Sequence, residues 1–454
     1  MNVSLSPHRF IWSSLKSRCL SLVLYVKSVL LKGRQPRKKS DEEHMEENQQ
    51  KNRYKLATKR PSTLFLLVLF ALPQSIIVSI TSIFQKIAAD FCVSQQSVHF
   101  LISYGLLGYA IGPLFAGPIG KLFGRKTTIF SGLTIAIFGV CLKLLTYYLR
   151  TFSLFVLGHF LSVFGGAFCA VAVYAIIHDY YYFKEAKRVL AFIVGGLLLV
   201  PGVMVTLCSV IACRYHWIDI QYLLIAFFLI IGLIAIKHPE TRQIIRPQHV
   251  RIRKIFKDYG TTISNPLFLY FSILIGTSVS MLYLFISEGP IIALQQLKIS
   301  PSLFGYLAFV PYVGGAASLF IAGKLSHSIR VYKILVFTLV CVVILNVTFF
   351  AFSLFYGITV FSLFFFSFLI ISLTMPINVS GVSLLHHYVR DRSNTSALLV
   401  TFFITIVMLI VYISGLIRPS IGPMTYPLML LIAAVFLVLD YVIIKILVKR
   451  YNNN

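Results

Sequence analysis

Residues 98–149 read VHFLISYGLLGYAIGPLFAGPIGKLFGRKTTIFSGLTIAIFGVCLKLLTYYL, which is an apolar stretch, a short glycine-rich link and a second apolar stretch. The first stretch covers residues 98–116 and the second covers residues 127–149. A helix needs about 20 mainly apolar residues to cross the roughly 30 Å of hydrocarbon in a bilayer, so each stretch is long enough for one crossing. The link carries Lys121, Arg125 and Lys126, whose charges belong at a membrane surface. The pattern therefore predicts two membrane-spanning helices that run in opposite directions.

The composition of the chain extends this prediction to its whole length. Apolar residues make up 58% of the 454 residues and charged residues only 12%, and the mean hydropathy is +0.85. Soluble domains carry about 25% charged residues, so the composition excludes a soluble enzyme, a soluble nucleic-acid-binding protein and a secreted disulfide-stabilised protein. The seven cysteines include no CxxC pair, which argues against a metal-binding knuckle. A membrane protein with many spans is the class that remains.

Hydropathy predicts twelve spans along the chain. Their ranges are 62–84, 98–116, 127–149, 152–177, 189–212, 218–236, 266–287, 302–323, 331–354, 358–384, 395–416 and 426–448. The longest polar break after residue 61, residues 237–265, is basic and divides the spans into two sets of six. The predicted fold is therefore an all-α membrane protein with two six-helix bundles, residues 62–236 and 266–448, and a tail at residues 449–454.

Lysine and arginine predict which ends of the spans face the cytoplasm. With the N-terminus inside, the outside links carry five such residues, which are Lys86, Arg150, Arg214, Lys298 and Arg418. The inside links carry about four times as many, which is the asymmetry expected of cytoplasmic loops. It accounts for the net charge of +27 without a nucleic-acid partner and favours contact with anionic lipid. Both termini are therefore predicted to be cytoplasmic.

The first 61 residues differ from the rest of the chain. Lys16, Arg18 and Lys27 interrupt their apolar stretch, and residues 35–61 are polar and charged. We expect a cytoplasmic extension that is either disordered or lies as an amphipathic helix on the membrane surface. A second interpretation is that translation begins at Met45, which would leave only a short polar leader before the first span.

The inner ends of the second and eighth spans are alike. Gly120-Lys121-Leu122 ends one and Gly323-Lys324-Leu325 ends the other, and a short basic link follows each. The first of these links, GPIGKLFGRK at residues 117–126, resembles the signature loop G-x-x-x-D-x-x-G-R-K of the major facilitator superfamily. Its gating residues would be Gly117, Lys121, Gly124, Arg125 and Lys126.

Five further stretches resemble the drug:proton antiporter branch of that superfamily, which includes the bicyclomycin-resistance proteins. They are residues 84–114, His178-Asp179 at the inner end of the fourth span, HPET at residues 238–241, residues 286–307, and NTSAL at residues 394–398. The resemblance covers residues 62 to 448. It implies the major facilitator fold, a central cavity lined by spans one, four, seven and ten, and alternating access that exports a drug-like or metabolite-like molecule in exchange for protons.

Three positions depart from the residues that family members carry. Lys121 replaces the aspartate of the signature loop, which in the family helps to lock the inner gate. Val78 replaces an aspartate in the first span, and His159 stands where proton-linked members carry an arginine in the fourth. Proton coupling would therefore have to use His159 or Glu288, or be absent.

Polar residues inside the predicted spans are the candidates for a transport site. Glu288 is either a titratable gate or a carboxylate at the membrane surface, and His159 either exchanges protons or bonds neighbouring helices as a neutral group. Lys143 is expected to extend its ammonium to the outer surface. The candidates that would line a substrate cavity, or bond helices to each other, are Gln74, Ser75, His159, Tyr174, Ser278, Tyr283 and Asn378.

The sequence carries no motif of an enzyme. HExxH, GxSxG and a phosphate-binding GK[ST] do not occur, and neither a cofactor nor a metal site is predicted. The expected partners are a small organic substrate, protons and membrane lipid, for a monomer in a bacterial inner membrane. Two other interpretations stay open: a metabolite importer or uniporter on the same fold, and a membrane sensor or assembly factor that no longer transports.

Overall fold

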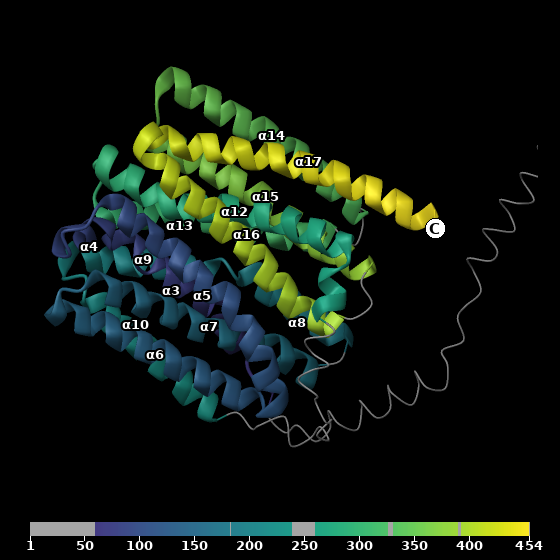
Figure 1. The fold of residues 1–454 in the computed structure, drawn as a ribbon, viewed down its shortest axis with the longest axis horizontal. Coiled ribbons are helices and arrows are strands. Elements are labelled where there is room, and N and C mark those ends of the chain that lie inside the picture. The colour runs from purple at the N-terminus through teal and green to yellow at the C-terminus, as the bar shows by residue number, and fades with distance from the viewer. Residues whose placement is uncertain (1–59, 182, 238–258, 326–329, 389–391, 454) are drawn as a thin grey trace, which may run out of the picture. The chain divides into compact units, whose positions relative to one another are not determined.

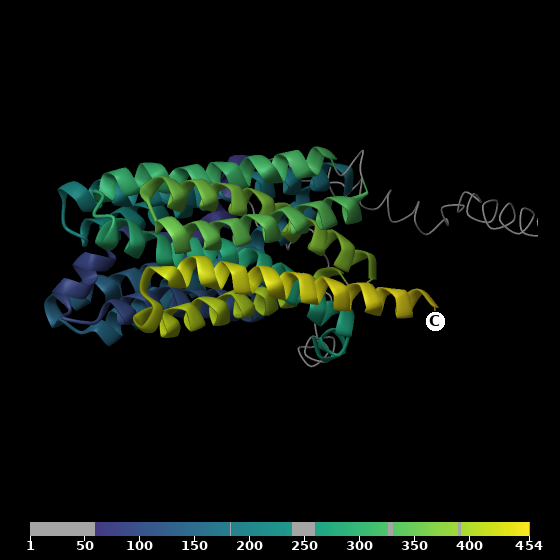
Figure 2. The ribbon, with the colours of Figure 1, turned by 90° about the horizontal axis from the view of Figure 1, so that it is seen from above.

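The computed structural model describes residues 60–453, apart from residues 182, 238–258, 326–329 and 389–391. The predictions for the N-terminal extension, for the HPET stretch and for most of the linker fall outside these residues, as do the side chains of His178 and of residues 391–396. From Ala57 onward the chain forms one compact unit. In its described part every regular element is a helix, and the long helices lie side by side (Figures 1 and 2).

The first set of helices matches the first six predicted spans. Its members are α3 (Thr63–Val78), η1 (Thr81–Ile83), α4 (Phe84–Asp90), α5 (Gln95–Leu122), α6 (Arg125–Leu149), α7 (Phe152–Tyr180), α8 (Phe183–Gly196), α9 (Leu199–Arg214) and α10 (Asp219–Ile236). The first predicted span is not one helix, because α3 ends at Val78. The Ser79 and Thr81 hydroxyls there donate to the Ile76 and Val78 carbonyl oxygens, at 2.7 and 2.8 Å, and compete with helical hydrogen bonds.

The second set matches the last six predicted spans. Its members are α12 (Pro266–Ile291), η3 (Ile292–Gln296), α13 (Pro301–Leu325), α14 (Val331–Tyr356), α15 (Val360–Tyr388), α16 (Arg392–Ile421), η4 (Gly422–Met424) and α17 (Thr425–Asn453). Eleven stretches of the described residues are long and apolar enough to cross a membrane. The last of them, Ala397–Tyr451, covers most of α16 and most of α17, which run in opposite directions (Figure 1). With α16 and α17 counted separately, the eleven stretches account for the twelve predicted crossings.

The two sets lie against each other, with the second above the first in Figure 1. In the first set α7 packs against α3, α5 and α6, and in the second α15 packs against α12, α13 and α14. Contacts between the sets run mainly along two helix pairs, α5 with α16 and α9 with α13. The exact division of the chain at residues 237–265 stays a prediction.

Glycine determines how closely α6 and α7 approach. A Cβ added at Gly165 would lie 2.3 Å from the Gly132 carbonyl oxygen, and one added at Gly158 would lie 2.6 Å from the Gly139 carbonyl oxygen. These distances leave no room for any side chain, so the two backbones touch directly. Small residues permit this kind of contact between helices in membranes, where dispersion and not hydrophobic burial holds helices together.

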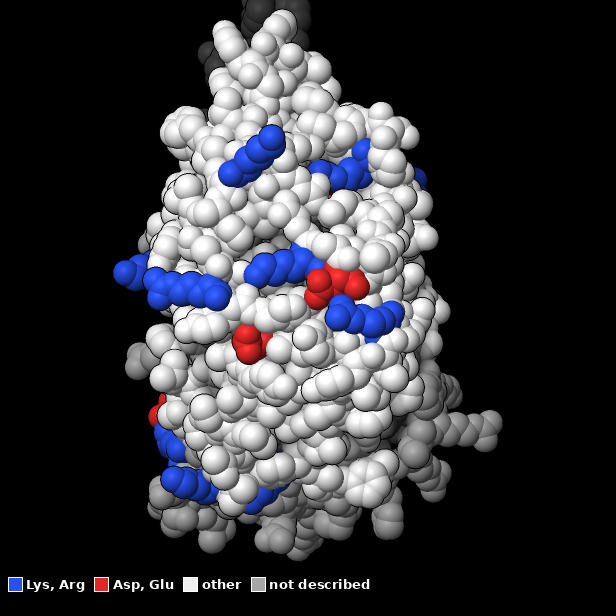
Figure 3. Space-filling view, turned by 90° about the vertical axis from the view of Figure 1, so that its left-hand side faces the viewer, with Lys and Arg blue, Asp and Glu red and all other residues white. Residues whose placement is uncertain are grey.

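We name the two ends of the unit by their elements. The α4 end carries α4 and the start of α5, and the loop end carries Phe123 and Gly124 between α5 and α6. Figure 3 looks onto the α4 end and shows a few charged side chains of both signs among a largely uncharged surface. The charge asymmetry of the sequence predicts that the α4 end faces outward.

Candidate functional site

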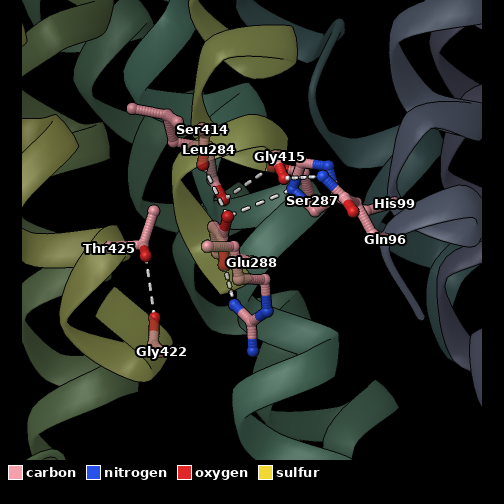
Figure 4. Close-up of polar contacts among 10 residues, drawn as sticks. Gln96, His99, Leu284, Ser287, Glu288, Ser414, Gly415, Gly422 and Thr425 are labelled. Carbon is pink, nitrogen blue, oxygen red and sulfur yellow. Dashed lines mark hydrogen bonds and ion pairs between the residues drawn. The ribbon is translucent and has the colours of Figure 1, made fainter. Parts of the chain in front are cut away.

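Glu288 lies at the centre of a buried cluster near the α4 end (Figure 4). Its side chain, on α12, is 0% exposed. The His99 Nε2 atom on α5 lies 3.1 Å from Glu288 Oε1, and the Ser414 hydroxyl on α16 donates to the same oxygen at 2.5 Å. The Arg418 guanidinium, one turn further along α16, binds Glu288 Oε2. We call these four residues the Glu288 cluster.

The Glu288 cluster joins the two sets of helices. His99 belongs to the first set, whereas the other three residues belong to the second. Two amide contacts lie beside it: Gln96 Nε2 donates to the Gly415 carbonyl oxygen at 3.1 Å, and Gln295 Nε2 donates to Gln95 Oε1 at 2.6 Å. Near the α4 end, hydrogen bonds therefore join α5 on one side to α12, η3 and α16 on the other.

The burial of Glu288 determines which partners its carboxylate needs. Helices of both sets enclose the Glu288 side chain, so it does not lie on the surface of the protein. A buried carboxylate is tolerated when a cation and further hydrogen bonds satisfy its oxygens, which Arg418, Ser414 and His99 do. Arg418, assigned from the sequence to an outside link, was missed as a partner, although Ser414 and Arg418 are spaced for one face of a helix.

A second group of polar side chains lies at the contact between the two sets. Tyr283 on α12 lies close to Tyr109 on α5, Tyr312 on α13 and Gln74 on α3, and Tyr109 lies close to Tyr174 on α7. We call these five residues the tyrosine group. Tyr109, Tyr283 and Tyr312 are at most 5% exposed.

The tyrosine group has unused hydrogen-bonding capacity. The Gln74 side chain lies beside the Tyr283 hydroxyl, yet neither Gln74 Oε1 nor the Tyr283 hydroxyl makes a well-aligned hydrogen bond to another described residue. Buried polar atoms are nearly always bonded in folded proteins, so unbonded ones are expected where water or a ligand binds. Tyr109 and Tyr312 were missed because nothing distinguishes them in the sequence from the other tyrosines.

The remaining candidates for the substrate cavity, Ser75, Ser278 and Asn378, are not among the five residues of the tyrosine group. The Ser75 and Ser278 hydroxyls donate to the Ala71 and Ile275 carbonyl oxygens of their own helices, at 2.9 and 2.8 Å. These bonds use the only proton that each hydroxyl has to donate. Asn378 is half-buried on α15.

The two sets also touch directly along α9 and α13. The Thr206 hydroxyl shares its one proton between the Gly305 carbonyl oxygen of α13 and the Gly202 carbonyl oxygen of its own helix, each at 3.0 Å. A Cβ added at Gly202 would lie 2.9 Å from both Phe309 and Tyr312. Gly202 therefore allows α9 to approach the side of α13 that carries Tyr312 of the tyrosine group.

The signature loop ties helices of the first set together at the loop end. Gly124 has a φ of 101°, a conformation that favours glycine, and α6 begins directly after it. Arg125 Nε donates to Asp179 Oδ2 of α7 at 3.0 Å, and Arg125 Nη1 donates to the Gly120 carbonyl oxygen of α5 at 2.7 Å. The arginine of the loop therefore connects three helices.

The other loop candidates lie around this arginine. Lys126 Nζ donates to the carbonyl oxygen of Ile236, the last residue of α10, at 2.9 Å. A Cβ added at Gly117 would lie 3.8 Å from the Tyr259 hydroxyl, which is ordinary contact. Lys121 is half-buried near the end of α5. The structure thus gives Arg125 and Lys126 bonding roles within the first set.

Lys143 and His159 lie inside the first set. The prediction that Lys143 extends to the surface is wrong, because its side chain is 0% exposed. Lys143 follows Gly139 by four residues and so shares the face of α6 that packs on α7. His159 on α7 is also 0% exposed. Neither side chain hydrogen-bonds to another described residue.

Comparisons with known proteins agree with this fold. Residues 63–390 match the family model described as Major Facilitator Superfamily. The multidrug resistance protein MdtL of Klebsiella pneumoniae (strain 342) is 26% identical over 248 residues, which are 52% of this chain and 59% of that protein. MdtL of Salmonella dublin is 27% identical over 217 residues, 47% and 53% of the two chains. The chain thus spans little more than half the length of the curated relatives it matches.

A solved structure shows the same architecture. The crystal structure of a D-xylose-proton symporter superposes with a TM-score of 0.65 at 12% sequence identity, over 83% of this chain and 96% of that chain. At this identity the likeness establishes the fold alone. It agrees with the all-α, multi-span architecture expected from the sequence. The chain belongs to the major facilitator superfamily.

Proposed function

We propose that this protein is a secondary active transporter that exports a small organic molecule in exchange for protons by alternating access. One observation carries the proposal: the Glu288 cluster closes the α4 end across both sets of helices, while the tyrosine group, drawn from both sets, keeps unbonded polar atoms. A central site between two helix sets, closed at one end, is what alternating access requires. The relatives named multidrug resistance proteins support the same activity.

The proposed cycle has a physical basis in the bonds between the sets. Polar contacts contribute to closing the α4 end, and in them His99, Gln96 and Gln95 belong to the first set. Such contacts exchange for water when the sets rotate, so two arrangements can lie close in free energy. In this proposal the α4 end faces outward, so the observed arrangement is the form closed to the outside of a bacterial inner membrane, and both termini lie in the cytoplasm.

The chemistry of the tyrosine group suits a particular class of substrate. Its members offer aromatic faces, hydroxyls and one amide but no formal charge. Such a site binds an uncharged amphipathic molecule, which packs on the rings and hydrogen-bonds to Tyr283 and Gln74. A molecule with a fixed positive charge would find no carboxylate within this group.

Lipid is the proposed partner of the outer helix faces. Large apolar side chains such as Phe337 on α14 and Leu233 on α10 are more than 60% exposed. A monomer surrounded by lipid would cover them in a membrane.

The substrate site is tested by replacing Tyr283 with phenylalanine. The ring stays and a single hydroxyl is lost, so we expect binding of an uncharged aromatic substrate to weaken by about ten-fold, the size of one buried hydrogen bond. Counterflow of labelled compounds in proteoliposomes measures this, and Tyr222→Phe, on an exposed face of α10, is the matched control. An unchanged apparent affinity in Tyr283→Phe would remove the hydroxyl from the site. Wild-type protein that moves no compound would favour the sensor interpretation.

A further inference from the structure

Two tyrosines join α14 to α17 at the end of the unit that lies away from α4 (Figure 1). The hydroxyls of Tyr332, the second residue of α14, and of Tyr441 on α17 hydrogen-bond to each other, and their ring centroids lie 6.1 Å apart. This bond uses one of the two hydroxyl protons, so the other stays available to an acceptor outside the pair. Tyr332 is 44% exposed, so such an acceptor can reach it.

The last turns of α17 extend beyond this tyrosine pair and beyond the other helices (Figures 1 and 2). From Tyr441 the helix continues to Asn453, a further distance of about 18 Å. The Tyr451 ring packs edge-on against Tyr388 of α15, at 5.8 Å between centroids, and Tyr388 stacks on Phe271 of α12 at 6.4 Å. Aromatic contacts therefore hold one side of the extension against the second set.

The other side of the extension is basic. Lys445 and Lys449 follow Tyr441 by one and two turns, and both point about 200–240° round the helix from Tyr451. Two further basic residues lie beside Tyr332, where α14 begins. We call these residues and the tyrosine pair the α14–α17 corner; its basic side chains, all exposed, are Arg330, Lys333, Lys445 and Lys449.

The positive charge of the α14–α17 corner is not neutralised within the part of the chain that the structure describes. None of the four basic side chains pairs with a carboxylate there. Asp440, the one acidic residue in the described ranges of α14 and α17, is only 4% exposed. In the signature loop of the first set, by contrast, Arg125 bonds to Asp179 and Lys126 to the Ile236 carbonyl oxygen. The corner therefore keeps charge for a partner outside the chain.

An apolar stripe continues from the corner along α14. Phe337, Val340 and Ile344 follow Lys333 at spacings of four, three and four residues, so they share its face of the helix. They are 66%, 49% and 58% exposed. A cation at the head of an exposed apolar stripe matches a molecule with an anionic head and hydrocarbon chains. A free anion would use the head of this surface and leave the stripe uncovered.

We propose that the α14–α17 corner binds an anionic phospholipid. The phosphate lies between Lys333 and Lys445 and accepts the free proton of the tyrosine pair, while the acyl chains cover the exposed stripe of α14. The charge asymmetry of the sequence predicts that this end faces the cytoplasm, where basic residues next to a span attract anionic headgroups. Bound lipid neutralises the corner and stabilises the contact of α14 with α17, whatever the protein transports.

Thermal melting of the purified protein in detergent tests this inference. We expect added dioleoylphosphatidylglycerol to raise the melting temperature, and dioleoylphosphatidylcholine to leave it unchanged, because the two lipids differ only in the headgroup. The variant Lys333→Gln/Lys445→Gln should need about thirty-fold more phosphatidylglycerol for half of the effect, the change that two lysines at an anionic lipid surface supply. Lys333→Arg/Lys445→Arg keeps both charges and should respond as the wild type does.

The matched control removes two exposed lysines elsewhere, in Lys237→Gln/Lys298→Gln, and should respond as the wild type does. An equal loss in this control would show that overall charge, and not the corner, attracts the lipid. Equal responses of the wild type to the two lipids would overturn the anionic site. The same rise with inorganic phosphate would make the corner a site for a free anion. A loss in the arginine variant as large as in the glutamine variant would assign the lysines to packing.

Discussion

Replacing Glu288 with glutamine is expected to open the α4 end and abolish transport against a gradient. The glutamine has nearly the same shape, but it leaves the Arg418 guanidinium, whose side chain is 12% exposed, without its counter-charge. Removing one partner of a buried ion pair costs about 3–5 kcal/mol. A form in which water reaches Arg418 avoids that cost, so the equilibrium between closed and open forms should move toward the open one.

Thiol labelling from the α4 side measures this shift. Ser103 lies on α5 one turn from His99 and is buried behind the Glu288 cluster. A cysteine at Ser103, in a background without the exposed Cys92 and Cys213, should react with a membrane-impermeant reagent only when the α4 end opens. We expect fast labelling in Glu288→Gln and slow labelling with Glu288 intact.

The control for this variant is Glu185→Gln. Glu185 pairs with Arg60 at 3.2 Å, but both side chains are about half exposed, at 50% and 48%. Exposed ion pairs contribute about 0–1 kcal/mol, so transport and labelling should stay at the wild-type level. Glu288→Gln that labels slowly and transports normally would show that the cluster holds the helices together without gating them.

Replacing Gly165 with alanine is expected to cause the largest loss of stability. The added methyl group would lie 2.3 Å from the Gly132 carbonyl oxygen and 2.6 Å from the Ala136 backbone nitrogen. Neither atom can rotate away as a side chain could, so α6 and α7 must separate along their shared face. Overpacking of this kind costs about 1–3 kcal/mol, and more where backbone must move. The melting temperature in detergent should fall, together with the yield of monodisperse protein.

Gly232 provides the matched control for this substitution. It lies inside α10, where an added Cβ would meet only Leu133 Cδ1, at the ordinary distance of 3.7 Å. Alanine is preferred to glycine in a helix by about 1 kcal/mol, so Gly232→Ala should melt at the wild-type temperature or above it. A Gly165→Ala protein that is as stable as Gly232→Ala would contradict the direct backbone contact of α6 and α7.

The predicted spans and the observed helices agree closely in the features that depend only on residues next to each other in the chain. The length of each apolar stretch, the basic links and the Gly124 turn are properties of neighbouring residues, so the amino-acid sequence is enough to predict them. The breaks within the first and fifth spans were not predicted, since the hydroxyls around Ser79 end α3 only through particular hydrogen bonds. Arg125 was identified as a loop residue, but its bonds to Asp179 and Gly120 depend on how the helices meet.

The sequence by itself determined that this is a helical membrane protein of twelve crossings with the signature loop of its family, because hydrophobic length and charge position decide membrane insertion one segment at a time. Only the tertiary structure decided that Glu288 pairs with His99 and Arg418, that Lys143 is buried, and that tyrosines from both sets of helices meet. The helices that carry these residues lie far apart along the chain. Their contacts depend on how each helix is rotated and packed, which no single segment encodes.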